Sequence, residues 1–164
     1  MATLRRATGD DAATLTRLRG LMHQAMGDEL SDAWRARCEQ DLRRRLATDT
    51  FVAFVVESAG EVVSGGCGWL EEHLPSPYAL DARRGHIASM STDPAHRRAG
   101  HGRAVFEALM GWFAQRDIPR VDLRATPDGR PLYEAFGFRV LGGATMAWNA
   151  PGSRPGMGDA SAVG

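Results

Sequence analysis

The sequence lacks lysine, has only two cysteines and carries no excess of either charge. All 20 of its fixed positive charges are arginine, so no lysine amine is available as a nucleophile. Cys38 and Cys67 are too few for the disulfide framework of a small secreted domain. They lie in no CxxC motif and next to no histidine. We therefore expect free thiols and no metal site.

Long apolar runs are also missing. No segment approaches the roughly 20 apolar residues of a membrane helix, and the N-terminal stretch MATLRRATGDD has no apolar core of a secretion signal. The formal net charge is zero, so no overall field favours nucleic acid or an anionic membrane. The arginines at 43–45 are most simply the solvated side of a helix. These absences predict a cytoplasmic protein with neither nucleic acid nor membrane as a partner.

What is present fits one domain of 164 residues. Residues 1–149 are expected to form the domain, and the small, glycine-rich residues 150–164 a disordered tail. Apolar spacing and capping residues predict the following order of elements: strand 2–8, helix 10–26, a helix capped by Ser31, strands 50–58, 61–72 and 86–94, a helix that Pro119 ends, strand 120–126, helix 129–138, and one or two strands within 138–148. This order suggests a mixed sheet with helices on its faces.

Glycines punctuate two of these segments. Gly65, Gly66 and Gly68 weaken the strand at 61–72, which predicts a bulge or the close approach of another group to its backbone. The stretch HRRAGHG at 96–102 joins a strand to a helix. A helix N-terminus offers unpaired N–H groups and partial positive charge, glycine lets the backbone approach a ligand, and arginine adds charge-assisted hydrogen bonds. The seam is therefore a candidate pyrophosphate cradle; a tight turn with solvated arginines is the structural alternative.

Other glycine-rich phosphate motifs are absent. The chain has no GxxxxGK[ST] loop, since it has no lysine, and no GxGxxG after a first strand. The run from Met90 to Phe138 instead resembles the GCN5-related N-acetyltransferase (GNAT) family. The resemblance rests on Pro94, on Arg97-x-x-Gly100-x-Gly102 opening a helix, on strand 120–126, and on Leu132-Tyr133-Glu134 followed by Gly137-Phe138.

The resemblance implies a GNAT-like α/β fold of the α+β type. Its sheet would be mixed and mostly antiparallel, with six to seven strands and helices on both faces. It also implies acetyl-CoA as co-substrate, with no metal. The pantetheine would lie along Met90, Ser91 and Thr92. The pyrophosphate would lie on the seam, on Arg97, Arg98, Ala99, Gly100, His101, Gly102 and Arg103. Thr126 stands where many members of the family carry an asparagine near the cofactor.

Acetyl transfer requires a neutral amine, an oxyanion stabilised by a strand N–H, and a proton for the departing thiolate. Tyr133 matches the family's tyrosine and is the candidate proton donor, the alternative being an amphipathic tyrosine that packs its helix. Glu71 and Glu72 are the candidate bases, ranked above His73 and His86. Asp28, Glu29 and Asp32, with the two glutamates, suggest an acidic acceptor region suited to a cationic amine.

These residues predict an N-acetyltransferase that acts on a primary amine of a small molecule or peptide. Three alternatives remain: an acyltransferase for longer acyl-CoA, a non-catalytic CoA-binding module, and a nucleic-acid-binding domain, which zero net charge opposes. The sequence is compatible with a monomer or a homodimer.

Overall fold

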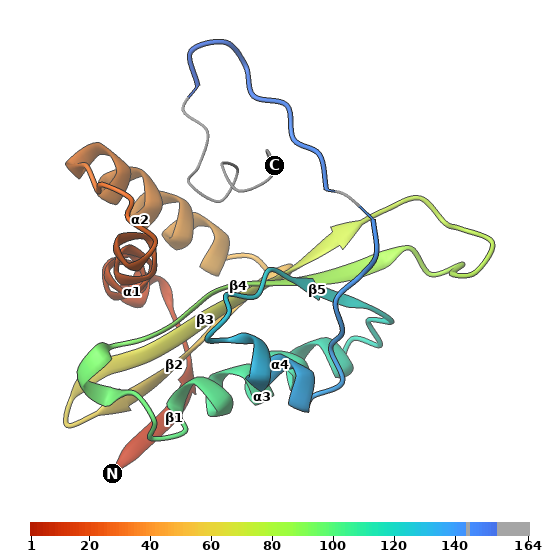
Figure 1. The fold of residues 1–164 in the computed structure, drawn as a ribbon. Coiled ribbons are helices and arrows are strands. Elements are labelled where there is room, and N and C mark those ends of the chain that lie inside the picture. The colour runs from red at the N-terminus through yellow and green to blue at the C-terminus, as the bar shows by residue number, and fades with distance from the viewer. Residues whose placement is uncertain (144, 154–164) are drawn as a thin grey trace.

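A five-stranded sheet runs through the chain in the order β1-β2-β3-β4-β5 (Figure 1). The structure is a computed structural model, and it describes residues 1–143 and 145–153. Neighbouring strands are antiparallel except β4 and β5, which are parallel. The bounds of the strands are β1 Ala2–Arg6, β2 Phe51–Ser58, β3 Glu61–Glu72, β4 Arg83–Thr92 and β5 Val121–Leu123.

Four α-helices cover the sheet: α1 Ala12–Ala25, α2 Asp32–Leu46, α3 His101–Ala114 and α4 Arg130–Ala135. Two predicted caps are confirmed. Ser31 accepts a hydrogen bond from the Trp34 N–H at 3.1 Å, and Thr8 with Asp11 forms a capping box before α1. A short 3₁₀ turn, Gly9–Asp11, precedes α1, so the α-helix begins two residues later than the predicted boundary.

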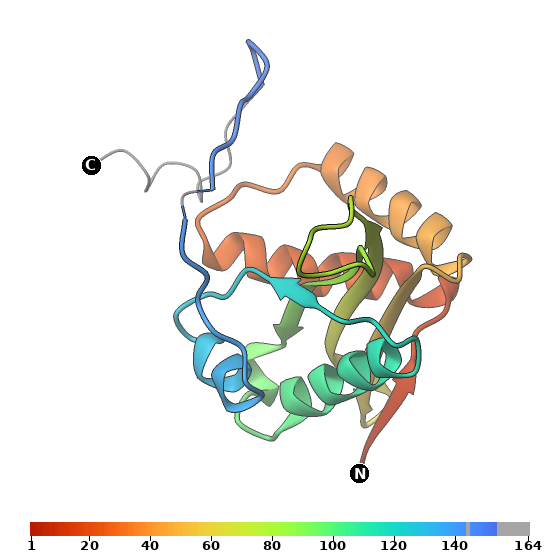
Figure 2. The same ribbon diagram turned by 90° about the vertical axis from the view of Figure 1, so that its right-hand side faces the viewer.

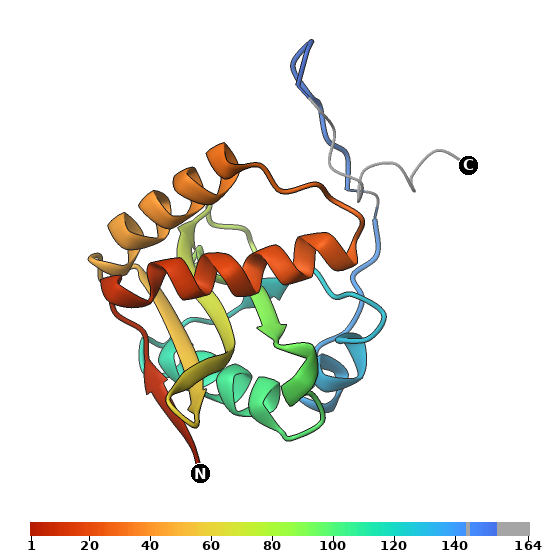
Figure 3. The ribbon, with the colours of Figure 1, turned by 90° about the vertical axis from the view of Figure 1, so that its left-hand side faces the viewer.

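The two faces of the sheet carry different helices, as predicted. On β3, a Cβ at Gly65 would meet Leu15 and Leu18 of α1, whereas one at the adjacent Gly66 would meet Val105 and Leu109 of α3. Successive strand residues point to opposite faces, so α1 and α3 lie on opposite sides. Figures 2 and 3 show α1 and α2 on one side of the sheet, with α3 and α4 on the other.

Close packing of α3 explains two glycines of the sheet, Gly68 and Gly85. A Cβ at Gly68 would lie 3.0 Å from the Phe113 ring, and one at Gly85 of β4 would lie only 2.5 Å from it. Phe113 is fully buried and cannot move aside cheaply. The predicted close approach to the backbone at 61–72 is therefore confirmed: the approaching group is α3.

The prediction of six to seven strands is wrong for the described residues, which form five. No strand is found at 138–143 or 145–148. Gly142 and Gly143 interrupt the apolar pattern there, and Gly143 has a φ of +104° that breaks an extended strand. Val140 and Trp148 are 72% and 82% exposed, so these apolar side chains find no partner within the described part. Of the tail predicted at 150–164, residues 154–164 lie outside the described residues.

No helix in the described ranges has both the length and the apolar character needed to cross a membrane.

Candidate functional site

Strands β4 and β5 pair over a short distance and then separate. Only Gly85, His86 and Ile87 of β4 are in register with β5, at Val121–Leu123. β4 continues to Thr92, and from Ala88 onward it pairs within the described residues with β3 alone. The backbone of Ala88–Thr92 therefore keeps one edge free, and its N–H and C=O groups can pair with an extended ligand.

A bulge lies within this free edge. Gly65 pairs with Ser91 and Cys67 with Ala88, so two residues of β4, Ser89 and Met90, stand opposite Gly66 alone. Ser89 has a φ of +59°, a left-handed conformation that costs a non-glycine residue about 1–2 kcal/mol. Its hydroxyl accepts a hydrogen bond from Arg19 of α1. The bulge therefore turns Ser89 toward the α1 side of the sheet.

Met90 points the other way. A Cβ at Gly66 would collide with the Met90 sulfur, and Met90 packs against the core cluster that contains Phe106 and Tyr133. At the end of the strand, the buried Ser64 hydroxyl lies 2.8 Å from the Thr92 hydroxyl and donates to the Ser91 carbonyl at 3.2 Å. The segment Met90–Thr92 is thus fixed on its β3 side and free on the other.

The seam between β4 and α3 has the backbone of an anion cradle. Arg98 and Gly100 both have positive φ, 63° and 81°, and helix α3 begins at His101. The Ala104 N–H donates to the Gly100 carbonyl at 3.0 Å, so the N–H groups of His101, Gly102 and Arg103 precede the helical ladder. These groups, the macrodipole of α3 and the two left-handed residues have the features that can accept an anion such as a phosphate.

The seam's arginine side chains have different surroundings. Arg97 reaches back to the Thr92 carbonyl, with 3.4 Å between donor and acceptor. Arg103 binds Glu107 at 2.9 Å and lies over the Phe136 ring, so it follows the helix rather than the loop. Arg98 and Ala99 are exposed. The seven predicted seam residues form the loop before α3 and its first turn. The backbone conformation, rather than the arginine side chains, gives this segment its shape.

Tyr133 lies on α4 and packs against α3, the helix that begins at the seam. Its ring is 5.1 Å from that of Phe106 in α3, and the residue is 8% exposed. Burial raises the pKa of its hydroxyl, which keeps it protonated and able to donate. Among the described residues the hydroxyl has no hydrogen-bond partner. A Cβ at Gly129 would lie 3.5 Å from the Tyr133 oxygen and 3.3 Å from that of Thr126.

Thr126 stabilises the turn before α4. Its hydroxyl accepts a hydrogen bond from the Gly129 N–H at 3.2 Å, and its carbonyl accepts from Gly129 and Arg130. Thr126 therefore shapes the turn that leads into α4 and places Tyr133. The structure brings Thr126, Tyr133 and the start of α3 to the same side of β4.

The predicted bases lie elsewhere. Glu71 and Glu72 pair with Arg84 and Arg83 at the opposite end of β4, and the backbone from Arg84 to Ser89, five residue steps, spans about 16 Å. Burial opposes the charge of Glu71, but hydrogen bonds from Trp69 and His73 outweigh it, so the pKa of Glu71 is lowered. A carboxylate held in this way is a weak proton acceptor. The structure does not bring either glutamate to the bulge.

His86 lies closer to the bulge. Among the residues of β4 that precede Ser89, His86 is the titratable one nearest to it. The His86 ring lies 4.6 Å from the ring of Trp69. Glu71 is near enough for the charge of His86 to contribute to its lowered pKa. Trp69, Glu71 and His86 therefore form a cluster on the face of the sheet that α2 covers.

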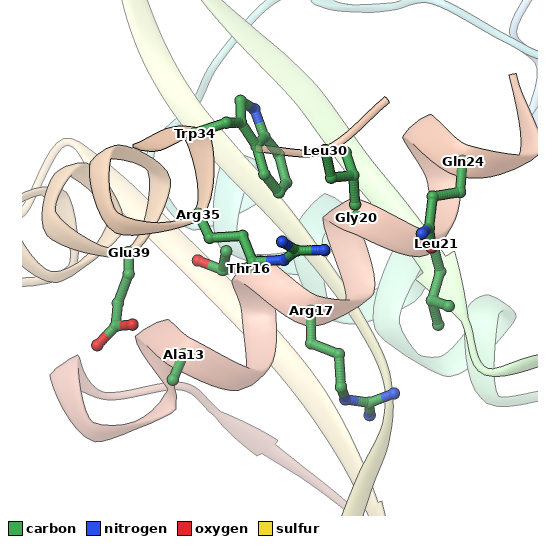
Figure 4. A pocket seen from close by; sticks show the side chains of 10 residues that line it. All are labelled: Ala13, Thr16, Arg17, Gly20, Leu21, Gln24, Leu30, Trp34, Arg35 and Glu39. Atoms are coloured by element: carbon green, nitrogen blue, oxygen red, sulfur yellow. The ribbon is translucent and has the colours of Figure 1, made fainter. Parts of the chain in front are cut away.

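Two hollows flank helix α2. The first, of about 340 Å³, is the groove between α1 and α2, where Arg17 and Arg35 lie beneath Trp34 (Figure 4). The second, of about 490 Å³, is lined by Arg19 and by one side of α2 that includes Arg37, Arg44 and Arg45. Sequence reasoning missed the second hollow. No local pattern marks Arg19, and the arginines at 43–45 indicated only a solvated surface.

Within residues 1–143 and 145–153, no three His, Cys, Asp or Glu side chains come together as a metal site. Cys67 is buried, and desolvation raises the pKa of its thiol to about 12.

Comparison with known proteins places the chain in a family. The model of the acetyltransferase (GNAT) family matches residues 19–138, so the chain belongs to this family. The chain is 34% identical over 79 residues to an uncharacterized N-acetyltransferase, YsnE, of Bacillus subtilis (strain 168). That match covers 45% of this chain and 48% of the relative, so the chain spans about half the length of the curated relative it matches.

Solved structures share the fold. A GCN5-related N-acetyltransferase from Ralstonia eutropha JMP134 superposes with a TM-score of 0.81 at 27% identity, over 90% of this chain and 99% of that one. A predicted acetyltransferase from Clostridium acetobutylicum, solved with acetyl-CoA, also gives a TM-score of 0.81, at 22% identity over 90% and 96% of the two chains. The predicted fold class is confirmed.

Proposed function

We propose that the protein transfers an acetyl group from acetyl-CoA to a primary amine of a small molecule or peptide. The observation that carries the proposal is the continuity of the free β4 edge with the start of α3. In the described residues, the backbone of Ala88–Thr92 has one edge without a partner strand. The chain then leads to α3, whose first N–H groups, at His101–Arg103, have no helical partner. The Clostridium acetobutylicum protein of the same fold was solved with acetyl-CoA.

The residues fit this co-substrate. A pantetheine arm carries amide groups, which can pair with the backbone of Met90, Ser91 and Thr92. A pyrophosphate can accept hydrogen bonds from the seam, where Gly100 has nothing within 4 Å of the position that a Cβ would take. Arg97 and Arg98 add positive charge on the exposed side of the loop.

Two groups of this chain would assist the chemistry. A backbone N–H at the bulge would stabilise the negative charge that develops on the carbonyl oxygen when the amine attacks the thioester. Tyr133, kept protonated by burial, would donate its proton to the sulfur as the carbon–sulfur bond breaks. The Tyr133 hydroxyl lies next to the turn at Gly129, on the α4 side of the free edge.

The proton leaving the amine needs an acceptor. Neither Glu71 nor Glu72 has a contact with the bulge among the described residues, and the Glu71 carboxylate is bound by Trp69 and His73, so their predicted role requires intervening groups. We assign the nearer step to His86, which would take the proton from the bulge through water. The charge interaction between Glu71 and His86 supports this order.

The test is thermal unfolding with and without acetyl-CoA, followed by an assay of thiol release with a panel of amines. At 100 times Kd, binding stabilises by about 2.7 kcal/mol, which raises the Tm by roughly 5–11 °C. Arg97→Ala, a change at an exposed position, should reduce this shift. No shift at millimolar acetyl-CoA would contradict the proposal, and a shift without thiol release for any amine would indicate a non-catalytic CoA-binding module.

A further inference from the structure

The hollow of about 490 Å³ beside α2 has an unusual lining for a protein with no net charge. Four arginines and one aspartate contribute to it. Arg37, Asp41, Arg44 and Arg45 recur at helical spacing, so one stripe of α2 presents them together. Because the whole chain has 20 basic and 20 acidic residues, the surplus of positive charge here is local.

Internal ion pairs do not cancel this charge. Asp41 binds both Arg44 and Arg45, at 2.5 and 2.7 Å. Arg19 and Arg37 have no carboxylate within ion-pair distance in the described part of the chain, and Arg19 donates instead to the neutral Ser89 hydroxyl. Two guanidinium groups therefore remain available for an anion from outside, and guanidinium forks bind carboxylate and phosphate well.

The hollow adjoins the place where the acceptor must react. Arg19 lines it and contacts Ser89 at the bulge of β4. Arg45 lines it as well, and its guanidinium lies 6.0 Å from the ring of Trp69, which in turn lies 4.6 Å from His86. The arginines thus lie on the α1–α2 side of the bulge, opposite Met90 and α3. The hollow is open to solvent, so it can receive a charged group of an acceptor whose amine lies at the bulge.

We propose that the acceptor amine carries an anionic oxygen group, a carboxylate or a phosphate, which Arg19 and Arg37 bind in this hollow. This inference rests on the proposed function and names its substrate class. It replaces the expectation of an acidic region for a cationic amine. Of the acids behind that expectation, Asp28 pairs with His23 and Asp32 with Arg35, and none of them lines the hollow.

The experiment compares pairs of amines in which one member carries an anionic group and the other a neutral group at the same position. Serine is paired with serinamide, and phosphoethanolamine with ethanolamine; spermidine is the cationic probe. We expect kcat/KM to favour the anionic member of at least one pair by roughly 10- to 100-fold. The serine pair reports a carboxylate and the phosphoethanolamine pair a phosphate. Equal rates within both pairs, or a preference for spermidine, would overturn the inference and leave acetyl transfer standing.

Variants locate the effect. Arg37→Gln, at an exposed position of α2, should abolish the preference through a higher KM for the anionic amine. Arg35→Gln is the matched control on the same helix, because Arg35 binds Asp32 and lines the other hollow; it should keep the preference. Loss of the preference in both variants, or in neither, would contradict the assignment to Arg37.

If none of these amines reacts, a binding measurement tests whether the hollow binds an anion. With acetyl-CoA saturating the cradle, inorganic phosphate at ten times its Kd should raise the Tm by roughly 3–6 °C above a sodium chloride control of equal ionic strength. Arg37→Gln should remove the rise and Arg35→Gln should keep it. Absence of an Arg37-dependent rise would overturn the inference, whereas absence of the acetyl-CoA shift itself would overturn the proposed function.

Discussion

The seam before α3 and the hollow beside α2 both offer positive charge, but they are built in opposite ways. The seam occupies one short stretch of sequence and presents backbone N–H groups, with left-handed residues at Arg98 and Gly100. The hollow combines side chains from two helices with a contact to β4. The first site therefore depends on backbone conformation and the second on side-chain identity.

Tyr133→Phe should have the largest effect on activity. It tests the one proposed role of a side chain, rather than of the backbone, on the α3 side of the sheet. A general acid contributes about 10²–10⁴-fold, so kcat should fall within that range. The Tm shift with acetyl-CoA should persist, because the backbone of the seam is unchanged. Steady-state thiol release measures the first quantity and thermal unfolding the second; an unchanged kcat would remove Tyr133 from the mechanism.

Gly85→Val should destabilise the sheet on which both sites stand. Its Cβ would lie 2.5 Å from the buried Phe113 ring, and overpacking of this kind costs about 1–3 kcal/mol. The Tm should fall by roughly 2–12 °C. Gly111→Ala is the control, since nothing lies within 4 Å of its Cβ position in α3, and it should leave the Tm equal or higher. A stable Gly85→Val protein would show that α3 can shift.

Gly100→Val and Arg98→Ala separate backbone from side chain within the seam. A left-handed β-branched residue costs about 1–2 kcal/mol or more, so Gly100→Val should weaken acetyl-CoA binding by at least about tenfold. Arg98→Ala removes one exposed charge and should weaken binding less. Isothermal titration gives both constants. A larger loss for Arg98→Ala would reverse the comparison and make the seam a side-chain site.

Cys67 should make the sheet sensitive to alkali. Burial raises the pKa of its thiol from 9.0 to about 12, so the folded state holds the proton more tightly than the unfolded state. The associated stability is complete below pH 9 and is lost as pH rises toward 12, at about 1.4 kcal/mol per pH unit. Urea unfolding at pH 8–11 should show a steeper decline for wild type than for Cys67→Ala; parallel declines would contradict the prediction.

The sequence predicted the seam and the element order well because those signals are local. Gly100 precedes an amphipathic helix in the sequence, and glycine favours the left-handed turn that the structure shows there. Local signals could not predict that residues 138–143 and 145–148 form no strand, nor that Glu71 has no contact with the bulge, since pairing partners and strand register decide both. Arg19 lacked any motif, because only the packing of α1 on β4 brings it to Ser89.

The bulge at Ser89 has a consequence for how relatives of this chain can diverge. It sends Met90 to the α3 side and Ser89 to the α1 side, so on our proposals one strand would serve two sites through separate side chains. Substitutions on α2 would then exchange one acceptor chemistry for another while the seam keeps its sequence. New specificities can be acquired from a few exposed positions on a single helix, without loss of the shared donor.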